Sequence, residues 1–219
     1  MKAVRTIIFA KAPLAGFAKT RLIPALGADG AAQLAQRMLQ HTLHTALSAQ
    51  LGPVELCVAP GPADPVWQRF DLPATLVWSS QGDGDLGARM ARAAQRVLAG
   101  GDAVILIGTD CPAIDKQLLH NAAQALTDHA ACIVPTADGG YALLGLQHFH
   151  ARLFDDMPWS TAQVTVQTLE RLQELQWRVK IHPTLYDIDE PADLQWLPEG
   201  WRESADRAKT QHEVQQHAK

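Results

Sequence analysis

The chain has 219 residues, of which 47% are hydrophobic, and a formal net charge of −4. This is enough apolar sequence to bury a substantial core, and we expect one domain at residues 1–197 followed by a polar tail at 198–219. The acidic balance argues against a nucleic-acid partner, and no apolar run approaches the roughly 18 residues of a membrane span, so we expect no membrane partner.

The cysteines and the N-terminal sequence indicate the cellular compartment of the protein. Cys57, Cys111 and Cys132 form no C-x-x-C pair, which favours reduced thiols over a disulfide framework. The first apolar run is short and is interrupted by Arg5, so it makes a poor signal peptide. We therefore expect a cytoplasmic protein.

Strand and helix patterns alternate along the chain. We expect strands at residues 4–9, 54–58, 75–78, 103–107, 131–135, 141–146 and 177–181. We expect helices at residues 28–49, 66–70, 88–99, 115–127, 160–175 and 192–196, with Ser160 or Thr161 as the N-cap of the fifth. This alternation predicts an α/β fold in which helices cover both faces of a mostly parallel sheet.

A basic loop follows the first strand. Residues 9–22 read FAKAPLAGFAKTRL and carry Lys11, Lys19 and Arg21 with Gly16 and no acid. Cations on a glycine-containing turn between a strand and a helix favour phosphate binding. An ordinary turn with a solvated basic edge is the alternative.

Acidic residues follow two other strands. Asp110 comes after residues 103–107, and Asp187 and Asp189 come after the last strand. Because ligands bind at the carboxyl ends of the strands in such sheets, these carboxylates could face the basic loop and hold Mg²⁺ beside a phosphate. Helix capping is the alternative for Asp110, Asp187 and Asp189.

Six motifs in order carry a resemblance over about residues 3–197: FAKAPLAGFAKTRL, QGDGDLGARM, GTDCPAI, DGGYALLGL, PWST and DIDEPADL. They resemble a bacterial family of transferases labelled as glycosyltransferases or radical-SAM-associated transferases. These are distant relatives of phospholactate guanylyltransferase in the GT-A nucleotide-diphospho-sugar transferase superfamily. The resemblance implies a three-layer α/β/α Rossmann-like GT-A fold with a mixed sheet, and a nucleotide bound with Mg²⁺ or Mn²⁺.

The resemblance also implies roles for individual residues. Lys11, Gly16, Lys19 and Arg21 would bind the nucleotide's phosphates, although the loop has one glycine where sugar nucleotidyltransferases have several. Asp110 and Asp189 would bind the metal, although the D-x-D element of GT-A glycosyltransferases is absent at Asp110.

Further motifs point to the nucleotide and the acceptor. Gly87 and Arg89 could contact the nucleotide or its phosphates, with a flexible loop as the alternative. Related enzymes bind the acceptor or sugar near the next two motifs, which suggests an acceptor site at Asp138, Gly139, Tyr141 and Trp159. Core packing of Tyr141, and helix capping by the residues after Trp159, are the alternatives.

Two reactions fit these residues. In nucleotidyl transfer, a small phosphorylated acceptor attacks a nucleoside triphosphate, with Lys19, Arg21 and Asp110 in catalytic roles. In glycosyl transfer from a nucleotide-sugar, Asp138 would be the base. The number of cations favours the first slightly, and a non-catalytic nucleotide-binding domain is a third alternative. The sequence identifies neither the base nor the acceptor, and it leaves the oligomeric state unknown.

Overall fold

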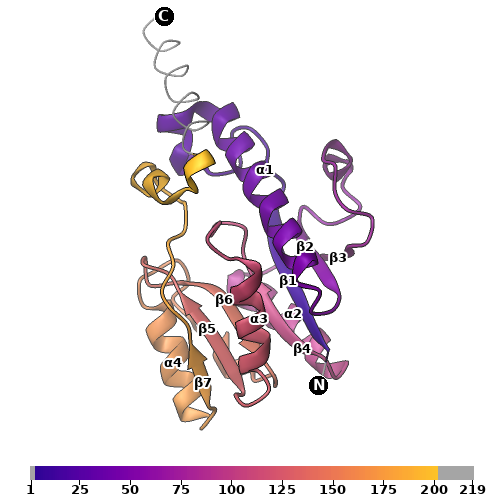
Figure 1. Cartoon of the computed structure of the whole chain (residues 1–219), viewed down its shortest axis with the longest axis vertical. Helices are drawn as coiled ribbons and strands as arrows, with labels where there is room; N and C mark the ends of the chain where they lie inside the picture. The colour runs from indigo at the N-terminus through magenta and orange to yellow at the C-terminus, as the bar shows by residue number, and fades with distance from the viewer. Residues whose placement is uncertain (1–2, 202–219) are drawn as a thin grey trace, which may run out of the picture.

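The computed structural model describes residues 3–201, in which seven strands form one sheet with helices on both faces (Figure 1). The strands are β1 (Val4–Lys11), β2 (Val54–Ala59), β3 (Val77–Ser80), β4 (Ala103–Ile107), β5 (Ala131–Pro135), β6 (Tyr141–Leu146) and β7 (Val179–Ile181). Their order is β3-β2-β1-β4-β6-β5-β7. Only β6 runs antiparallel to its neighbours, β4 and β5. The predicted mixed, mostly parallel α/β sheet is confirmed.

Four α-helices cover the sheet within the described residues. They are α1 (Ile23–Ala49), α2 (Leu86–Ala99), α3 (Lys116–Ala125) and α4 (Val164–Glu174), and the short 3-10 helices are η1 (Thr20–Leu22), η2 (Pro65–Arg69), η3 (Ala151–Leu153) and η4 (Pro191–Trp196). α1 and α3 pack on one face and α2 and α4 on the other. None of the helices in this part of the chain has the length and apolar character needed to span a bilayer.

The central strands bury both faces. Ile8 and Ile105 belong to the core under α1 and α3, whereas Ile7 and Leu106 belong to the core under α2 and α4. All five residues of β4 are buried. This explains why the strand reads as a continuous apolar run, and each fully buried Leu or Ile contributes about 1.5–3 kcal/mol to folding.

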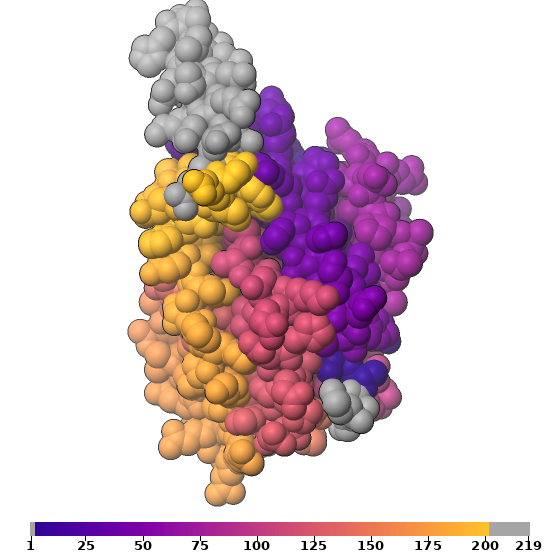
Figure 2. Space-filling model, in the orientation of Figure 1, coloured from indigo at the N-terminus to yellow at the C-terminus, as the bar shows by residue number. Residues whose placement is uncertain are grey.

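A third apolar cluster joins the two ends of the chain. Leu22, Leu26 and Met38 pack with Ile188 and Leu197, so that the segment after β7 lies against the first half of α1. Figure 2 shows the yellow segment in contact with the indigo and purple surface. This packing brings the residues after β7 to the same edge as the basic loop.

The boundary predicted at residue 198 falls inside this packed region. The guanidinium of Arg37 lies 4.4 Å from the ring centroid of Trp201, and the ring of His41 meets Trp201 edge-on at 5.2 Å. The remainder of the predicted tail lies outside the described residues.

Of two predicted helix starts, one agrees with the structure and the other does not. α1 begins at Ile23, but Gly27 has non-helical angles (φ 72°, ψ 166°), so the regular helix does run from the predicted start. The start predicted for α4 is wrong, because its N-cap is Gln163 with no side-chain cap. Thr161 instead closes a turn, where its hydroxyl donates to Pro158 O at 2.7 Å and accepts from Gln163 N at 3.3 Å.

The third strand is displaced toward the C-terminus relative to prediction. β3 pairs with β2 in a register that opposes Glu55 to Val77 and Val58 to Ser80. Ser79 donates to the Glu55 carboxylate at 2.6 Å, so polar residues that resemble a loop are part of this strand.

Candidate functional site

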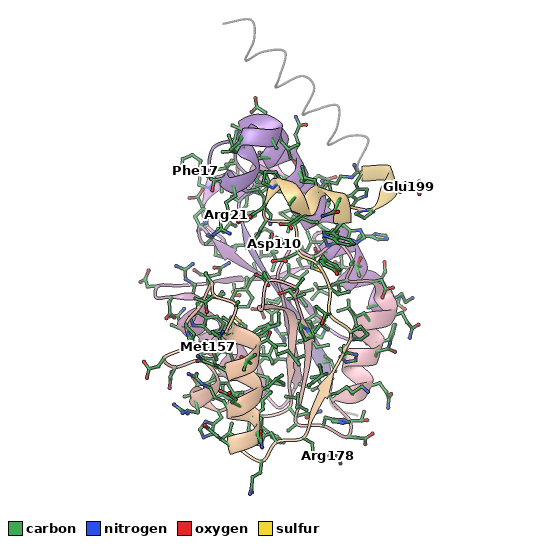
Figure 3. All side chains as sticks on the ribbon, turned by 90° about the vertical axis from the view of Figure 1, so that its left-hand side faces the viewer. Phe17, Arg21, Asp110, Met157, Arg178 and Glu199 are labelled. Carbon is green, nitrogen blue, oxygen red and sulfur yellow. The ribbon has the colours of Figure 1, made fainter. Side chains whose placement is uncertain are left out.

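Three residues from distant segments meet at the carboxyl ends of the strands. Lys19 Nζ lies 2.7 Å from Asp110 Oδ1 and 2.6 Å from Asp189 Oδ1. Figure 3 shows Asp110 and Arg21 toward one end of the sheet, with Arg178, just before β7, at the other. The structure therefore brings one residue of the basic loop together with both predicted metal-binding aspartates.

Backbone contacts hold the two acidic segments side by side. Ile188 N donates to Asp110 O at 2.9 Å, and the Cys111 thiol donates to Tyr186 O at 3.3 Å. With Ile188 buried against α1, these bonds fix Asp189 beside Asp110.

Helix capping does not explain either aspartate. The N-cap of α3 is Asp115, whose carboxylate accepts from Leu118 N at 2.7 Å. The N-cap of η4 is Glu190, which forms a capping box with Asp193. The capping alternatives for Asp110 and Asp189 are therefore wrong.

Lys19 is held firmly in this arrangement. Its side chain is 8% exposed, and its backbone adopts the left-handed conformation (φ 47°, ψ 47°), which costs a non-glycine residue about 1–2 kcal/mol. Burial disfavours its ammonium, but Asp110 and Asp189 outweigh burial and raise the pKa of Lys19. The two ion pairs thus offset both costs.

The carboxylates themselves remain open to solvent. The side chains of Asp110 and Asp189 are 49% and 40% exposed. Nearby, burial raises the pKa of Asp187 to about 6, helped by the negative charges of Asp138, Asp189 and Asp193. This edge therefore carries more negative charge than Lys19 neutralises.

These residues fit a divalent cation of the magnesium type. Oxygens of Asp110 and Asp189 converge on one point, and in residues 3–201 no three His, Cys, Asp or Glu side chains are grouped to form a protein cage for a metal. Mg²⁺ is commonly held by one or two carboxylates, with water and phosphate as its other ligands.

The rest of the basic loop is more loosely placed. Lys11 is exposed and forms no ion pair with the described residues, and Arg21 lies 3.7 Å from the exposed Glu190. Gly16 has a φ of 81° with open space around it. Two backbone N–H groups of the turn, at Phe17 and Ala18, donate to Leu14 O, so they are used within the loop. These two N–H groups are therefore not free to bind a phosphate, whereas the side chains of Lys11 and Arg21 are exposed.

The loop before α2 is tied down by its own residues. Arg89 donates to Gly84 O at 2.9 Å and to Gln81 Oε1 at 3.3 Å. A Cβ on Gly87 would overlap the Trp159 indole and Phe154 O, so close packing accounts for glycine there. These contacts hold Arg89 and Gly87 within the protein, and a contact of either residue with a nucleotide stays a prediction.

Gln81 is a buried polar residue that the sequence analysis did not identify as a candidate. Its buried amide donates to Ala10 O at 3.0 Å and to Cys57 O at 3.1 Å, which links the ends of β1 and β2. Its place directly after a strand, before Gly-Asp-Gly-Asp, was the available signal.

The predicted acceptor residues form a packed unit. Asp138 Oδ1 accepts from Thr136 Oγ1 at 2.5 Å and from Gly140 N at 2.9 Å. A Cβ on Gly139 would overlap the backbone of Ala162.

The two aromatic members of this unit also pack together. The rings of Tyr141 and Trp159 meet edge-on at 6.4 Å, and both rings pack against the core under α2 and α4. Burial raises the pKa of Tyr141. Trp159 Nε1 is buried with no hydrogen-bond partner in residues 3–201. Tyr141 therefore packs against the core, and its contact with an acceptor stays a prediction.

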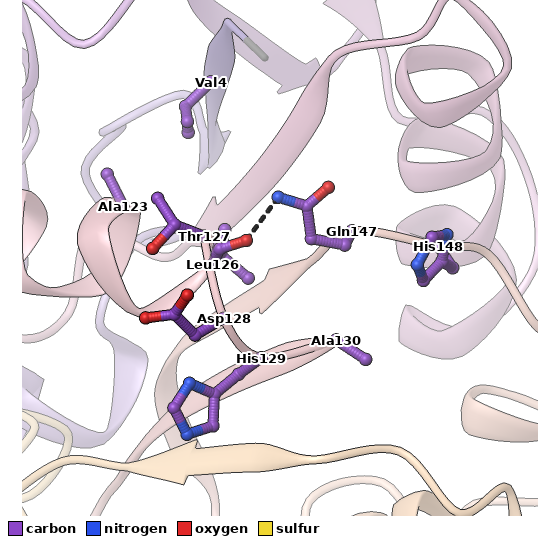
Figure 4. Close-up of a pocket in the computed structure, with 9 residues that line it drawn as sticks. All are labelled: Val4, Ala123, Leu126, Thr127, Asp128, His129, Ala130, Gln147 and His148. Carbon is purple, nitrogen blue, oxygen red and sulfur yellow. Dashed lines mark hydrogen bonds between the residues drawn. The ribbon is translucent and has the colours of Figure 1, made fainter. Parts of the chain in front are cut away.

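A pocket of about 500 Å³ lies at the other end of the sheet, where β1 and β5 begin. It is lined by Val4 at the start of β1, by residues 126–130 between α3 and β5, and by Gln147, whose amide donates to Leu126 O (Figure 4). None of the predicted site residues lines it.

Comparison with solved structures supports the fold and its class of activity. The chain is similar to a protein from Desulfovibrio desulfuricans G20 described as a nucleotide-diphospho-sugar transferase, with 29% identity over 97% of this chain and 99% of that chain and a TM-score of 0.86. These comparisons support a transferase with a nucleotide-diphospho-sugar transferase fold.

More distant structures share the fold alone. A cytidylyltransferase from Leptospira borgpetersenii has 14% identity over 88% of this chain and 84% of its own, with a TM-score of 0.55. Rv0371c from Mycobacterium tuberculosis, in complex with manganese, has 16% identity over 89% of this chain and 97% of its own, with a TM-score of 0.50. No match was found among curated proteins.

A family model described as "Uncharacterized protein conserved in bacteria (DUF2064)" matches residues 42–161. The matched region contains Asp110 and the predicted acceptor residues, whereas Lys19 and Asp189 lie on either side of it. Because the match spans more than half of the sequence, the chain belongs to the DUF2064 family.

Proposed function

We propose that this protein is a metal-dependent transferase that acts on a nucleotide-activated substrate at the edge formed by Lys19, Asp110 and Asp189. The observation that carries the proposal is the pairing of one buried ammonium with two half-exposed carboxylates at the strand ends. A purely structural ion pair would have no need of a second, solvent-accessible acid.

The charge balance supports metal dependence. Asp110 and Asp189 share the buried Lys19, and the charges of Asp138 and Asp189 act on Asp187 beside them, so a nucleotide without a metal would be repelled by the excess of negative charge. Asp110 and Asp189 would hold Mg²⁺ or Mn²⁺, which when bound neutralises phosphate charge. The manganese complex of Rv0371c is in keeping with such a site in this fold.

The chain's own cations would bind the phosphates. Lys11 and Arg21 are exposed at this edge and Lys19 is fixed there, so the loop offers three positive charges to a triphosphate. Lys19 and Arg21 would stabilise charge on the reacting α-phosphate, which is an electrostatic role. Gly87 and Arg89 would shape the nucleotide side through the loop that they hold.

The acceptor would lie near residues 138–162. Ala137 N donates to Leu185 O at 3.0 Å, so the turn at Asp138 lies beside the segment that carries Asp187 and Asp189, which supports this location. Gly139, Tyr141 and Trp159 would form its wall, because they pack as one unit with the segment before α4.

Nucleotidyl transfer is the favoured reaction. An oxygen of a small phosphorylated acceptor would form a bond to the α-phosphorus of a nucleoside triphosphate, and pyrophosphate would leave. Kinship with phospholactate guanylyltransferase is part of this proposal. Glycosyl transfer is the second candidate, on the description of the Desulfovibrio protein. Its predicted base, Asp138, already accepts hydrogen bonds from Thr136 and Gly140.

A thermal-shift panel tests the proposal. ATP, GTP, CTP, UTP, dTTP and several nucleotide-sugars are each added with and without Mg²⁺. A ligand at about a hundred times its Kd adds roughly 2.7 kcal/mol, which corresponds to about 5–10 °C for a chain of this length. We expect a shift with one triphosphate that requires Mg²⁺.

A matched pair of variants makes the panel specific. Asp110→Ala should abolish the Mg²⁺-dependent shift. Asp115→Ala removes a nearby aspartate that caps α3, and should lower the Tm by the equivalent of about 1 kcal/mol while keeping the ligand shift. A shift with nucleotide-sugars alone would favour glycosyl transfer, and no shift with any compound would contradict the proposal.

A further inference from the structure

Building on the proposed function, we propose that Lys19 occupies, in the free protein, the position between Asp110 and Asp189 that the divalent cation takes in the nucleotide complex. The cation would then bind tightly only together with the nucleotide. Lys19 would link the two binding events in addition to contacting phosphate.

The first argument is spatial. Lys19 Nζ is 2.7 Å from Asp110 Oδ1 and 2.6 Å from Asp189 Oδ1. A magnesium ion bound by the same two oxygens would lie about 2.0–2.1 Å from each. The ammonium and the metal would therefore compete for one small space, and their positive charges would repel each other.

The second argument is energetic. The Lys19 side chain is 8% exposed, so a cation that displaced it from both aspartates would leave a buried ammonium without a partner. Such a charge is costly, and its cost opposes the binding of a free cation. A nucleotide arriving with the metal offers its phosphates to the ammonium and removes that cost.

The coupling must act in both directions. If the nucleotide strengthens metal binding, the metal strengthens nucleotide binding by the same factor. The two other cations of the loop do not share this role, because Lys11 is exposed with no ion pair among the described residues and Arg21 pairs only loosely with Glu190, at 3.7 Å.

The experiment measures Mn²⁺ binding to the nucleotide-free protein by loss of the free-Mn²⁺ paramagnetic resonance signal. It compares the wild type with Lys19→Met and with Lys11→Met, which removes the same charge from the same loop. We expect Lys19→Met to bind Mn²⁺ at least about tenfold more tightly than the wild type, within the usual range of coupling between sites. Lys11→Met should change the affinity by less than about twofold, because exposed charges are screened by solvent and salt.

A double variant tests whether the tighter Mn²⁺ binding of Lys19→Met depends on Asp110. Lys19→Met combined with Asp110→Asn should lose the gain, since one of the two carboxylates is then absent. Lys19→Gln, which keeps a polar end, serves as a second test should Lys19→Met fail to fold by circular dichroism.

Equal Mn²⁺ affinity in the wild type and the Lys19 variants would overturn the inference, as would an equal gain in Lys11→Met. This result is separable from the proposed function. A Tm increase with a nucleotide that requires Mg²⁺, together with equal Mn²⁺ affinities, would overturn the proposed role of Lys19 and leave the proposed function standing. Absence of any Tm increase with a nucleotide would contradict the proposed function. The difference in Mn²⁺ affinity between the wild type and Lys19→Met would still test whether Lys19 occupies the cation position.

Discussion

Two clusters of charged side chains in this protein differ in the exposure of their carboxylates and in their ratio of acids to cations. In one, the Glu55 carboxylate is fully buried and accepts from Arg5 at 3.3 Å, from Ser79 at 2.6 Å and from both terminal nitrogens of Arg96. In the other, Asp110 and Asp189 share the single ammonium of Lys19 and remain half exposed. The first has two cations for one acid, and the second has two acids for one cation.

The difference separates a structural cluster from a candidate site. The Glu55 carboxylate has no capacity left for a ligand, and its partners join β1, β2, β3 and α2. Asp110 and Asp189 keep solvent-facing oxygens and excess negative charge. Substitutions in the first cluster should change stability, and substitutions in the second should change ligand binding.

The largest expected effect is on activity. Asp110→Ala should lower metal-dependent turnover by about 100- to 1000-fold, because a group that places charge against the reacting phosphates is lost. Its free energy of unfolding should fall by no more than about 1 kcal/mol, because the buried Lys19 loses one half-exposed partner and keeps the other, Asp189. Turnover and urea denaturation measured on the same preparation check both parts, and undiminished turnover would remove Asp110 from the site.

Glu55→Gln should give the reverse pattern. Glutamine keeps one acceptor oxygen, but Arg5 and Arg96 lose the negative charge that they share. We expect unfolding to require about 2 kcal/mol less, below the range for fully buried pairs because both guanidiniums reach solvent. The Mg²⁺-dependent nucleotide shift should be retained. Unchanged stability in urea would refute the structural role.

The pH dependence of stability sharpens the same contrast. Burial disfavours the Glu55 carboxylate, but hydrogen bonds from Arg96 and Ser79 outweigh burial and lower its pKa below the ordinary value of 4.5. A lowered pKa in the folded state adds stability above the unfolded pKa, and this is lost as the pH falls through the folded pKa. The stability difference between wild type and Glu55→Gln should therefore be complete at pH 7 and shrink below about pH 4.5. Urea titrations at pH 7, 5, 4 and 3 measure this, and a constant difference would contradict it.

The smallest effect is expected at Arg21. Its pair with Glu190 is 3.7 Å long and exposed on both sides, so Arg21→Gln should alter stability by less than about 0.5 kcal/mol. If Arg21 binds phosphate, the same variant should weaken nucleotide affinity by about tenfold, at the low end expected for one hydrogen bond to a charged group because Arg21 is exposed. Calorimetric titration distinguishes this from a surface role, in which the affinity would be unchanged.

Much of the fold could be predicted from local pattern. The continuous apolar run of β4 and the turn at Asp138 identify a buried strand and a returning strand, and the structure has both. β3 could not be placed from its pattern, because Ser79 is in the strand for its bond to Glu55, a long-range contact. The start of α4 was missed because Thr161 satisfies its own turn.

The geometry of the candidate site was harder to predict. The sequence placed Lys19, Asp110 and Asp189 after strands, but a contact across 170 residues depends on the packing of Ile188 and Leu197 against α1. The roles of these residues in binding and catalysis remain predictions.

The central claim is that the two aspartates bind a nucleotide through a metal. Isothermal titration of the nucleotide identified by the thermal-shift panel, with and without Mg²⁺, tests this claim in wild type and in Asp189→Ala. We predict binding to wild type in Mg²⁺ only, and none to the variant in either condition. Equal binding with and without Mg²⁺, or undiminished binding to Asp189→Ala, would contradict it.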